Sequence, residues 1–154
     1  MKKYFVCAAT MVLFGFMPPA FAATSPALFT GAVNSTCVLT VGVAGIITPN
    51  ADFTKLSSDN AGGSESTVSV LATGAIYKVS AIAPGAFTAG PSTADSFTSK
   101  YTLSGATSAS NVAGATTTTL TPGVTNVAVD LEADKSSGTF NAGIYNAAVT
   151  VRCE

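Results

Sequence analysis

The chain is 154 residues long, only 10% of its residues are charged, and its formal net charge is −1. It contains no histidine, which excludes Ser-His and Cys-His nucleophile arrangements and metal sites built from imidazole. After residue 22, the few cationic side chains are scattered singly, so the sequence offers no basic patch for nucleic acid or an anionic membrane. The abundance of Thr, Ser, Gly, Ala and Val, with few Glu, Lys, Gln or Arg, favours strands over helices.

Residues 1–22 have the pattern of a secretory signal peptide. Two lysines open the segment, an apolar run continues to Met17, and a small-x-small sequence ends at Ala22. The apolar run is too short to span a bilayer comfortably. We therefore expect cleavage after Ala22 and a secreted mature chain that is not inserted in a membrane.

Residues 27–33 form the first alternating segment of the mature chain. Ala27, Phe29, Gly31 and Val33 would share one face of an extended strand, because side chains in a strand have a period of two. Such a strand can pair within its own sheet or with another molecule, and the sequence does not distinguish the two. We divide the mature chain into an N-terminal extension, residues 23–35, and a domain, residues 36–154.

Seven further β-rich runs follow, separated mostly by Gly, Pro, Asn and Asp. They cover residues 36–43, 65–73, 75–82, 98–104, 115–121, 124–131 and 143–153. The polar stretch 107–119 is predicted to be a loop that runs into a Thr-rich edge strand. The sequence shows no amphipathic helix and no βαβ rhythm, so this spacing indicates an all-β domain, an antiparallel β-sandwich of immunoglobulin-like type.

Two cysteines, Cys37 and Cys153, remain after the signal peptide. An even count in a secreted chain predicts one disulfide, which in the chain-entropy model stabilises a closed loop of roughly 100 residues by about 4 to 5 kcal/mol. An intermolecular bridge or a redox-active thiol is the alternative. Strand parity points both thiols inward, on faces shared with apolar residues. These residues are Leu39, Val41 and Val43 beside Cys37, and Tyr145, Ala147, Val149 and Val151 beside Cys153.

Asp130, Glu132 and Asp134 lie on one side of a predicted strand at a period of two. Carboxylates at this spacing could hold a calcium ion or form the carboxylate pair of a hydrolase. The opposite side carries Val129 and Leu131, and the solvated face of a half-buried strand is the favoured interpretation. The sequence also lacks a phosphate-binding glycine motif. We expect no enzyme activity, catalytic residue, metal or cofactor.

Both ends of the mature chain resemble chaperone-usher pilins. The N-terminal LFTGAVNSTCVLTV has an aromatic-x-Gly-x-aliphatic pattern before a strand that carries a cysteine; the matching residues are Phe29, Gly31, Val33 and Cys37. The C-terminal FNAGIYNAAVTVRCE is similar to the last pilin strand; the matching residues are Phe140, Ala142, Gly143, Tyr145, Val149 and Val151. Similar endings occur in the spore coat protein U group, so the C-terminal match identifies the fold group better than the family.

In the pilin family, an immunoglobulin-like fold lacks its last strand, and the N-terminal extension of the next subunit fills the resulting groove. The resemblance implies a structural subunit of a surface fimbria, with identical or related subunits, a periplasmic chaperone and an outer-membrane usher as partners. It implies that the donor residues are Ala27, Phe29, Gly31 and Val33. It also implies that the last strand faces the chaperone or the neighbour through Tyr145, Ala147, Val149 and Val151.

The cysteines depart from the pilin pattern. Familiar pilins bridge the first strand to the end of the second, whereas no cysteine lies between Cys37 and Cys153 in this sequence. Because the chaperone docks on the last strand in the family, a bridge at Cys153 could alter that docking or belong to a self-contained domain. The alternative function is a monomeric secreted or surface binding domain, in which residues 27–33 form an ordinary first strand.

Overall fold

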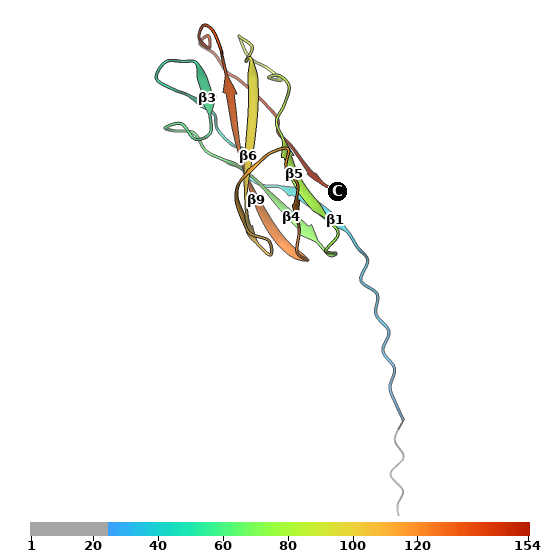
Figure 1. Cartoon of the computed structure of the whole chain (residues 1–154). Coiled ribbons are helices and arrows are strands. Elements are labelled where there is room, and N and C mark those ends of the chain that lie inside the picture. The colour runs from blue at the N-terminus through green and yellow to red at the C-terminus, as the bar shows by residue number, and fades with distance from the viewer. Residues whose placement is uncertain (1–24) are drawn as a thin grey trace, which may run out of the picture. The chain divides into compact units, whose positions relative to one another are not determined.

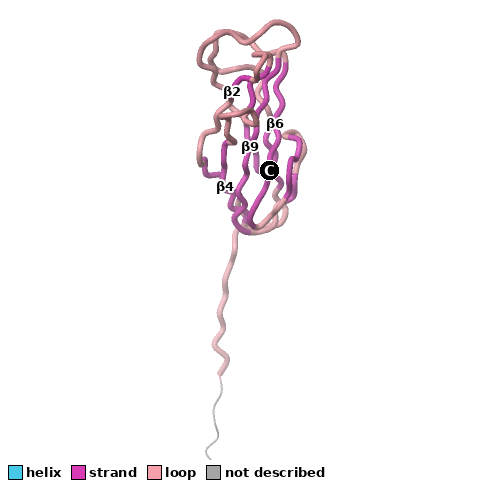
Figure 2. Tube along the Cα trace, turned by 90° about the vertical axis from the view of Figure 1, so that its left-hand side faces the viewer, coloured by secondary structure: helices cyan, strands magenta, loops and turns pink. Residues whose placement is uncertain are grey.

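The structure is a computed structural model that describes residues 25–154. The predicted signal peptide, residues 1–22, lies outside the described residues. The chain divides into two units after Gly31, and the unit Ala32–Glu154 contains every strand of the described residues. Figure 2 shows that the described part consists of strands and loops.

Ten β-strands form in residues 25–154. They are β1 Cys37–Val41, β2 Thr48–Pro49, β3 Lys55–Ser57, β4 Ser66–Ala72, β5 Lys78–Ile82, β6 Ser96–Gly105, β7 Ala109–Ala113, β8 Thr118–Thr119, β9 Gly123–Asp134 and β10 Thr150–Cys153.

The twelve-residue strand β9 is the centre of a seven-stranded antiparallel sheet. One edge of β9 pairs with β6, and the other edge pairs first with β4 and then with β3. Outside these, β1 pairs with β4, β2 with β3 and β7 with β6. Figure 1 shows β4 and β6 beside β9, with β1 beyond β4. A smaller antiparallel sheet has the order β10-β5-β8.

The two sheets share one apolar core. Val70, Tyr101 and Val127 from the larger sheet are fully buried together with Val79 and Ala81 from β5 of the smaller sheet. Valine and aromatic side chains at a period of two suit such a half-buried pleated surface. The prediction of an all-β chain with antiparallel sheets is confirmed, and two sheets around a common core are consistent with a β-sandwich.

Several predicted strand boundaries are wrong. The predicted loop 107–119 contains β7, which pairs with β6 because the hairpin lets Ala109 and Val112 pack against the core. Asn111 in β7 has a positive φ of 51°, a conformation that asparagine tolerates better than most residues. The short strands β2 and β3 were not expected, because two or three residues carry too little alternation to detect.

The predicted strand 143–153 is regular only in β10, Thr150–Cys153. Before it, Asn146 forms an isolated bridge with Ala89, and the neighbouring residues are not part of a ladder. A strand needs a partner along its length to remain regular, and β5 provides one only as far back as Thr150. The segment 145–149 therefore follows the edge of the molecule without ladder pairing.

Candidate functional site: an apolar groove between two sheet edges

A groove of about 570 Å³ lies between β1 and the C-terminal segment. One rim consists of β1 and residues 44–47, and the other rim consists of residues 145–151. Val68, Val129 and Leu131 of the larger sheet are among the lining side chains between the rims. We call this feature the edge groove, and none of its lining residues is charged.

Both rims are sheet edges with free backbone hydrogen-bonding groups. Among the described residues, β1 has a ladder partner only in β4, and β10 has one only in β5. The N–H and C=O groups on the other side of each strand point toward the groove or solvent, and such an edge is a template for another strand.

The apolar face of β1 lines this groove instead of packing in the core. Leu39 and Val41 were predicted to share an inward face with Cys37, yet Val41 is 80% exposed and Leu39 is 40% exposed. Both side chains line the edge groove. Val43 is also exposed, so the expectation that this face is buried is wrong within the single chain. The period of two is correct, but the described residues supply no cover for that face.

All four residues singled out on the last strand line the edge groove; they are Tyr145, Ala147, Val149 and Val151. Tyr145 also fixes the far end of its rim. Its hydroxyl donates to the carbonyl oxygen of Asn141 at 2.8 Å and lies 2.6 Å from the Ser92 hydroxyl. Its ring packs at 4.9 Å from that of Phe87 and 5.5 Å from that of Phe140. These contacts hold the rim in place where regular pairing is missing.

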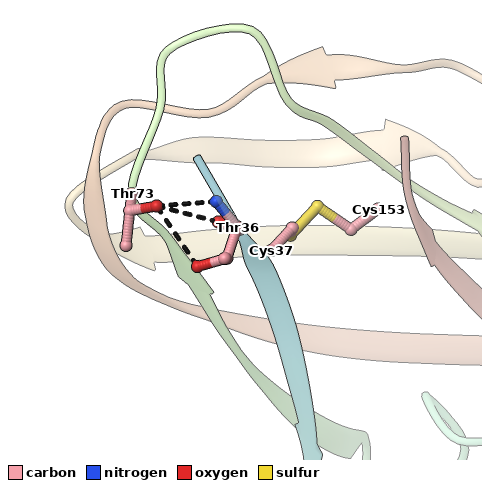
Figure 3. The surroundings of a disulfide bond; sticks show 4 residues. All are labelled: Thr36, Cys37, Thr73 and Cys153. Atoms are coloured by element: carbon pink, nitrogen blue, oxygen red, sulfur yellow. Dashed lines mark hydrogen bonds between the residues drawn. A yellow bond between two sulfur atoms is a disulfide. The ribbon is translucent and has the colours of Figure 1, made fainter. Parts of the chain in front are cut away.

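The predicted disulfide between Cys37 and Cys153 is confirmed (Figure 3). It joins the first residue of β1 to the last residue of β10, with their Cα atoms 6.4 Å apart. Since these strands are the two rims, the bridge fixes their separation at one end of the edge groove.

Residues 44–47 are part of a rim that the sequence did not predict. The apolar pair Ile46 and Ile47 could have indicated it, but the predicted strand ended at Val43. Ile46 exchanges two backbone hydrogen bonds of 2.9 Å with Ser64, which extends the rim beyond β1. A Cβ on Gly45 would lie 2.9 Å from the Ser64 carbonyl oxygen, so only glycine allows the two backbones to pass this closely.

The donor residues predicted by the resemblance lie in a segment without ladder pairing. Residues 25–36 form no strand, and Phe29 and Val33 are 93% and 85% exposed. No heavy atom lies within 4 Å of a Cβ built on Gly31, apart from those of its chain neighbours. Residues 27–33 are therefore not assigned to any of the ten strands.

The carboxylates of β9 alternate with buried residues, as a solvated strand face would. The Nζ of Lys55 lies 2.8 Å from Oε1 of Glu132 and 3.6 Å from Oδ1 of Asp134. The hydrogen bond between Lys55 and Glu132 raises the pKa of the lysine and lowers the pKa of the glutamate. Burial and then the charge of Glu132 raise the pKa of Asp134. Asp130 instead accepts a hydrogen bond of 2.8 Å from the Ser58 hydroxyl.

Residues 25–154 contain no cluster of three or more His, Cys, Asp or Glu side chains arranged to hold a metal ion. Within the same range, no helix is long and apolar enough to cross a membrane.

No protein-family model matches the chain, and neither a curated protein nor a solved structure matches it. The fold and the site define an all-β protein with two antiparallel sheets, whose edges border an uncovered apolar groove.

Proposed function

We propose that this protein is a structural subunit of a surface fimbria, of the chaperone-usher pilin type. Each copy donates residues 24–34 as a strand to the edge groove of the next copy. The two-sheet domain is then an immunoglobulin-like sandwich that is incomplete by one strand. Secretion through the periplasm, with a chaperone and an usher as partners, completes the proposal.

The edge groove is the observation that carries this proposal. Its rims offer two rows of free backbone groups, and its lining is mostly apolar and contains no charged residue. An extended peptide satisfies both at once, because its backbone pairs with the rims while alternate side chains enter the groove.

The N-terminal extension has the chemistry of such a peptide. Ala27, Phe29, Gly31 and Val33 recur at a period of two, and residues 23–36 contain no charged side chain. Leu28 and Phe29 are 89% and 93% exposed in the single chain. Large exposed apolar side chains commonly mark an interaction site, and insertion into a groove removes Phe29 and the others on its face from water.

The proposal is tested by replacing Val41 with Glu. Val41 lines the groove and is 80% exposed, so V41E should unfold at the same temperature as wild type. An inserted strand would bury the new carboxylate without a partner, which is costly. We expect V41E to lose polymers on unboiled gels and to bind a labelled peptide of residues 24–35 at least tenfold more weakly, about 1.4 kcal/mol, in fluorescence anisotropy.

Ile76→Glu is the matched control, because Ile76 is 75% exposed and does not line the edge groove. I76E should polymerise and bind the peptide as wild type does. If V41E polymerises like I76E, the groove is not the assembly site. A wild-type chain that stays a stable monomer and ignores the peptide would favour the monomeric binding domain.

A further inference from the structure

Thr73 holds the residues that precede β1 in line with that strand (Figure 3). Its Oγ1 accepts a hydrogen bond from the Thr36 N–H at 2.7 Å and donates one to the Asn34 carbonyl oxygen at 2.6 Å. The Thr73 N–H donates to the Thr36 carbonyl oxygen at 2.9 Å. The ladder between β1 and β4 ends with Cys37 opposite Ala72, so these bonds continue its register past the end of both strands.

Ser35, between the two bonded residues, lies against Gly74. A Cβ built on Gly74 would be 2.5 Å from the Ser35 hydroxyl oxygen, so the glycine leaves room for this contact. Residues 34–36 are therefore held beside Thr73 and Gly74, on the β4 side of β1. Neither Thr73 nor Gly74 lines the edge groove, to which β4 contributes only Ser66 and Val68.

The two rims of the edge groove run in opposite directions. Cys37 at the start of β1 is bonded to Cys153 at the chain's end, whereas Ile47 and Tyr145 line the opposite end of the groove. A strand inserted between them is thus parallel to β1 and antiparallel to the last segment, or the reverse.

Chain length prevents the extension from entering its own groove parallel to β1. In that direction Val33 would lie farther along the groove than Ala27, by about 20 Å for the seven residues of a strand. The chain must then return from Val33 to Cys37, and four residues reach at most about 14 Å. The four residues from Val33 to Cys37 are therefore too short for the return of about 20 Å, and this direction is excluded within one chain.

The opposite direction requires a hairpin, with its turn in residues 34–36. Thr73 holds these residues extended on the β4 side, which opposes such a turn. We infer that Thr73 is a positioning residue that keeps the extension out of its own groove, so that the occupant is the extension of a second copy. This inference rests on the proposed function. It adds a reason why the extension of a neighbouring copy, and not that of the same chain, occupies the edge groove.

Thr73→Val tests this, because valine has the shape of threonine without the hydroxyl. Loss of the two side-chain hydrogen bonds should raise the fraction of closed monomers roughly tenfold at equal chain concentration, relative to wild type. Closed monomers are recognised by two properties: chymotrypsin does not cut them at Leu28 and Phe29, and they do not take up the labelled peptide of residues 24–35. Thr73→Ser retains the hydroxyl and should behave as wild type.

The inference is overturned if T73V polymerises as T73S does, or if its extra monomers are cut at Leu28 and Phe29 and still bind the peptide. Equal melting temperatures for the two variants, measured by circular dichroism, exclude a folding defect as the cause of extra monomers. A wild-type chain that neither polymerises nor binds the peptide overturns the proposed function and this inference together. Wild-type assembly with an unaffected T73V overturns the inference alone.

Discussion

Tyr101 has a fully buried phenol whose hydroxyl lies between the two sheets. Its oxygen is 2.8 Å from the Thr116 carbonyl oxygen, 2.7 Å from the Thr118 hydroxyl and 3.2 Å from the Val79 carbonyl oxygen. Tyr101→Phe removes that oxygen from a fully buried side chain and takes a hydrogen-bond partner from the buried Val79 carbonyl and from the Thr116 and Thr118 oxygens nearer the surface. We expect the free energy of unfolding to fall by about 1 to 3 kcal/mol, measured by urea denaturation at neutral pH.

Tyr145→Phe is the control for this change. Its hydroxyl also bonds to a carbonyl and to another hydroxyl, but toward the surface, where water can replace it. We expect Y145F to cost less than about 1 kcal/mol. If Y101F and Y145F lose the same free energy of unfolding, burial does not determine how much the Tyr101 hydroxyl contributes to stability.

Among the elements, β1 and β10 are the two strands that the disulfide joins. Each has a ladder on one side only, and their other sides border the edge groove. The bridge closes a loop with a sequence separation of 116 residues. The double variant C37A/C153A should lose about 4 to 5 kcal/mol in free energy of unfolding if loop entropy dominates.

The measurement is urea denaturation of the variant and of wild type with and without reductant. Reduced wild type should match the double variant, because both lack the same cross-link. A loss below about 1 kcal/mol would show that the rims stay together without the bridge, and that loop entropy does not describe its role.

The sequence correctly predicted which side chains share a face of a strand. It did not predict whether that face is buried. A period of two correctly grouped Leu39 with Val41, and Val149 with Val151, because side-chain direction is a local property of a strand. Whether a face is covered depends on which chain supplies the next strand, and no local pattern encodes that. The disulfide was predictable because only two cysteines remain after residue 22.

The local sequence also did not predict which alternating segments form regular strands. Residues 145–149 alternate as well as β10 does, yet they lack a ladder because β5 ends at Ile82. The hydrogen bonds of Thr73 join residues 37 positions apart, and one threonine in a Thr-rich chain gives no sign of such a contact. Pairings between distant segments decide both features.

At the scale of the whole molecule, the proposed assembly requires one chain to carry both halves of a contact. The edge groove offers two open sheet edges, and the extension offers an exposed alternating segment. A contact between two different surfaces of identical copies is head to tail, and it produces an open filament unless its rotation closes a ring. Electron microscopy of the purified polymer should therefore show linear fibres.

The absence of a side chain at Gly31 should determine whether the extension of one copy fits into the edge groove of the next. In the single chain nothing lies within 4 Å of a Cβ built on it, so Gly31→Val should leave the melting temperature unchanged. In a filled groove the donor backbone passes closely between two rims, where added bulk forces the strands apart at a cost of about 1 to 3 kcal/mol. A synthetic peptide of residues 24–35 with G31V should bind wild-type protein roughly tenfold more weakly in fluorescence anisotropy. Ala32→Val adds similar bulk on the opposite face of the strand and should bind nearly as wild type does. If both peptides are weakened equally, Gly31 does not mark the close approach, and the alternation of residues 27–33 does not set the register of insertion.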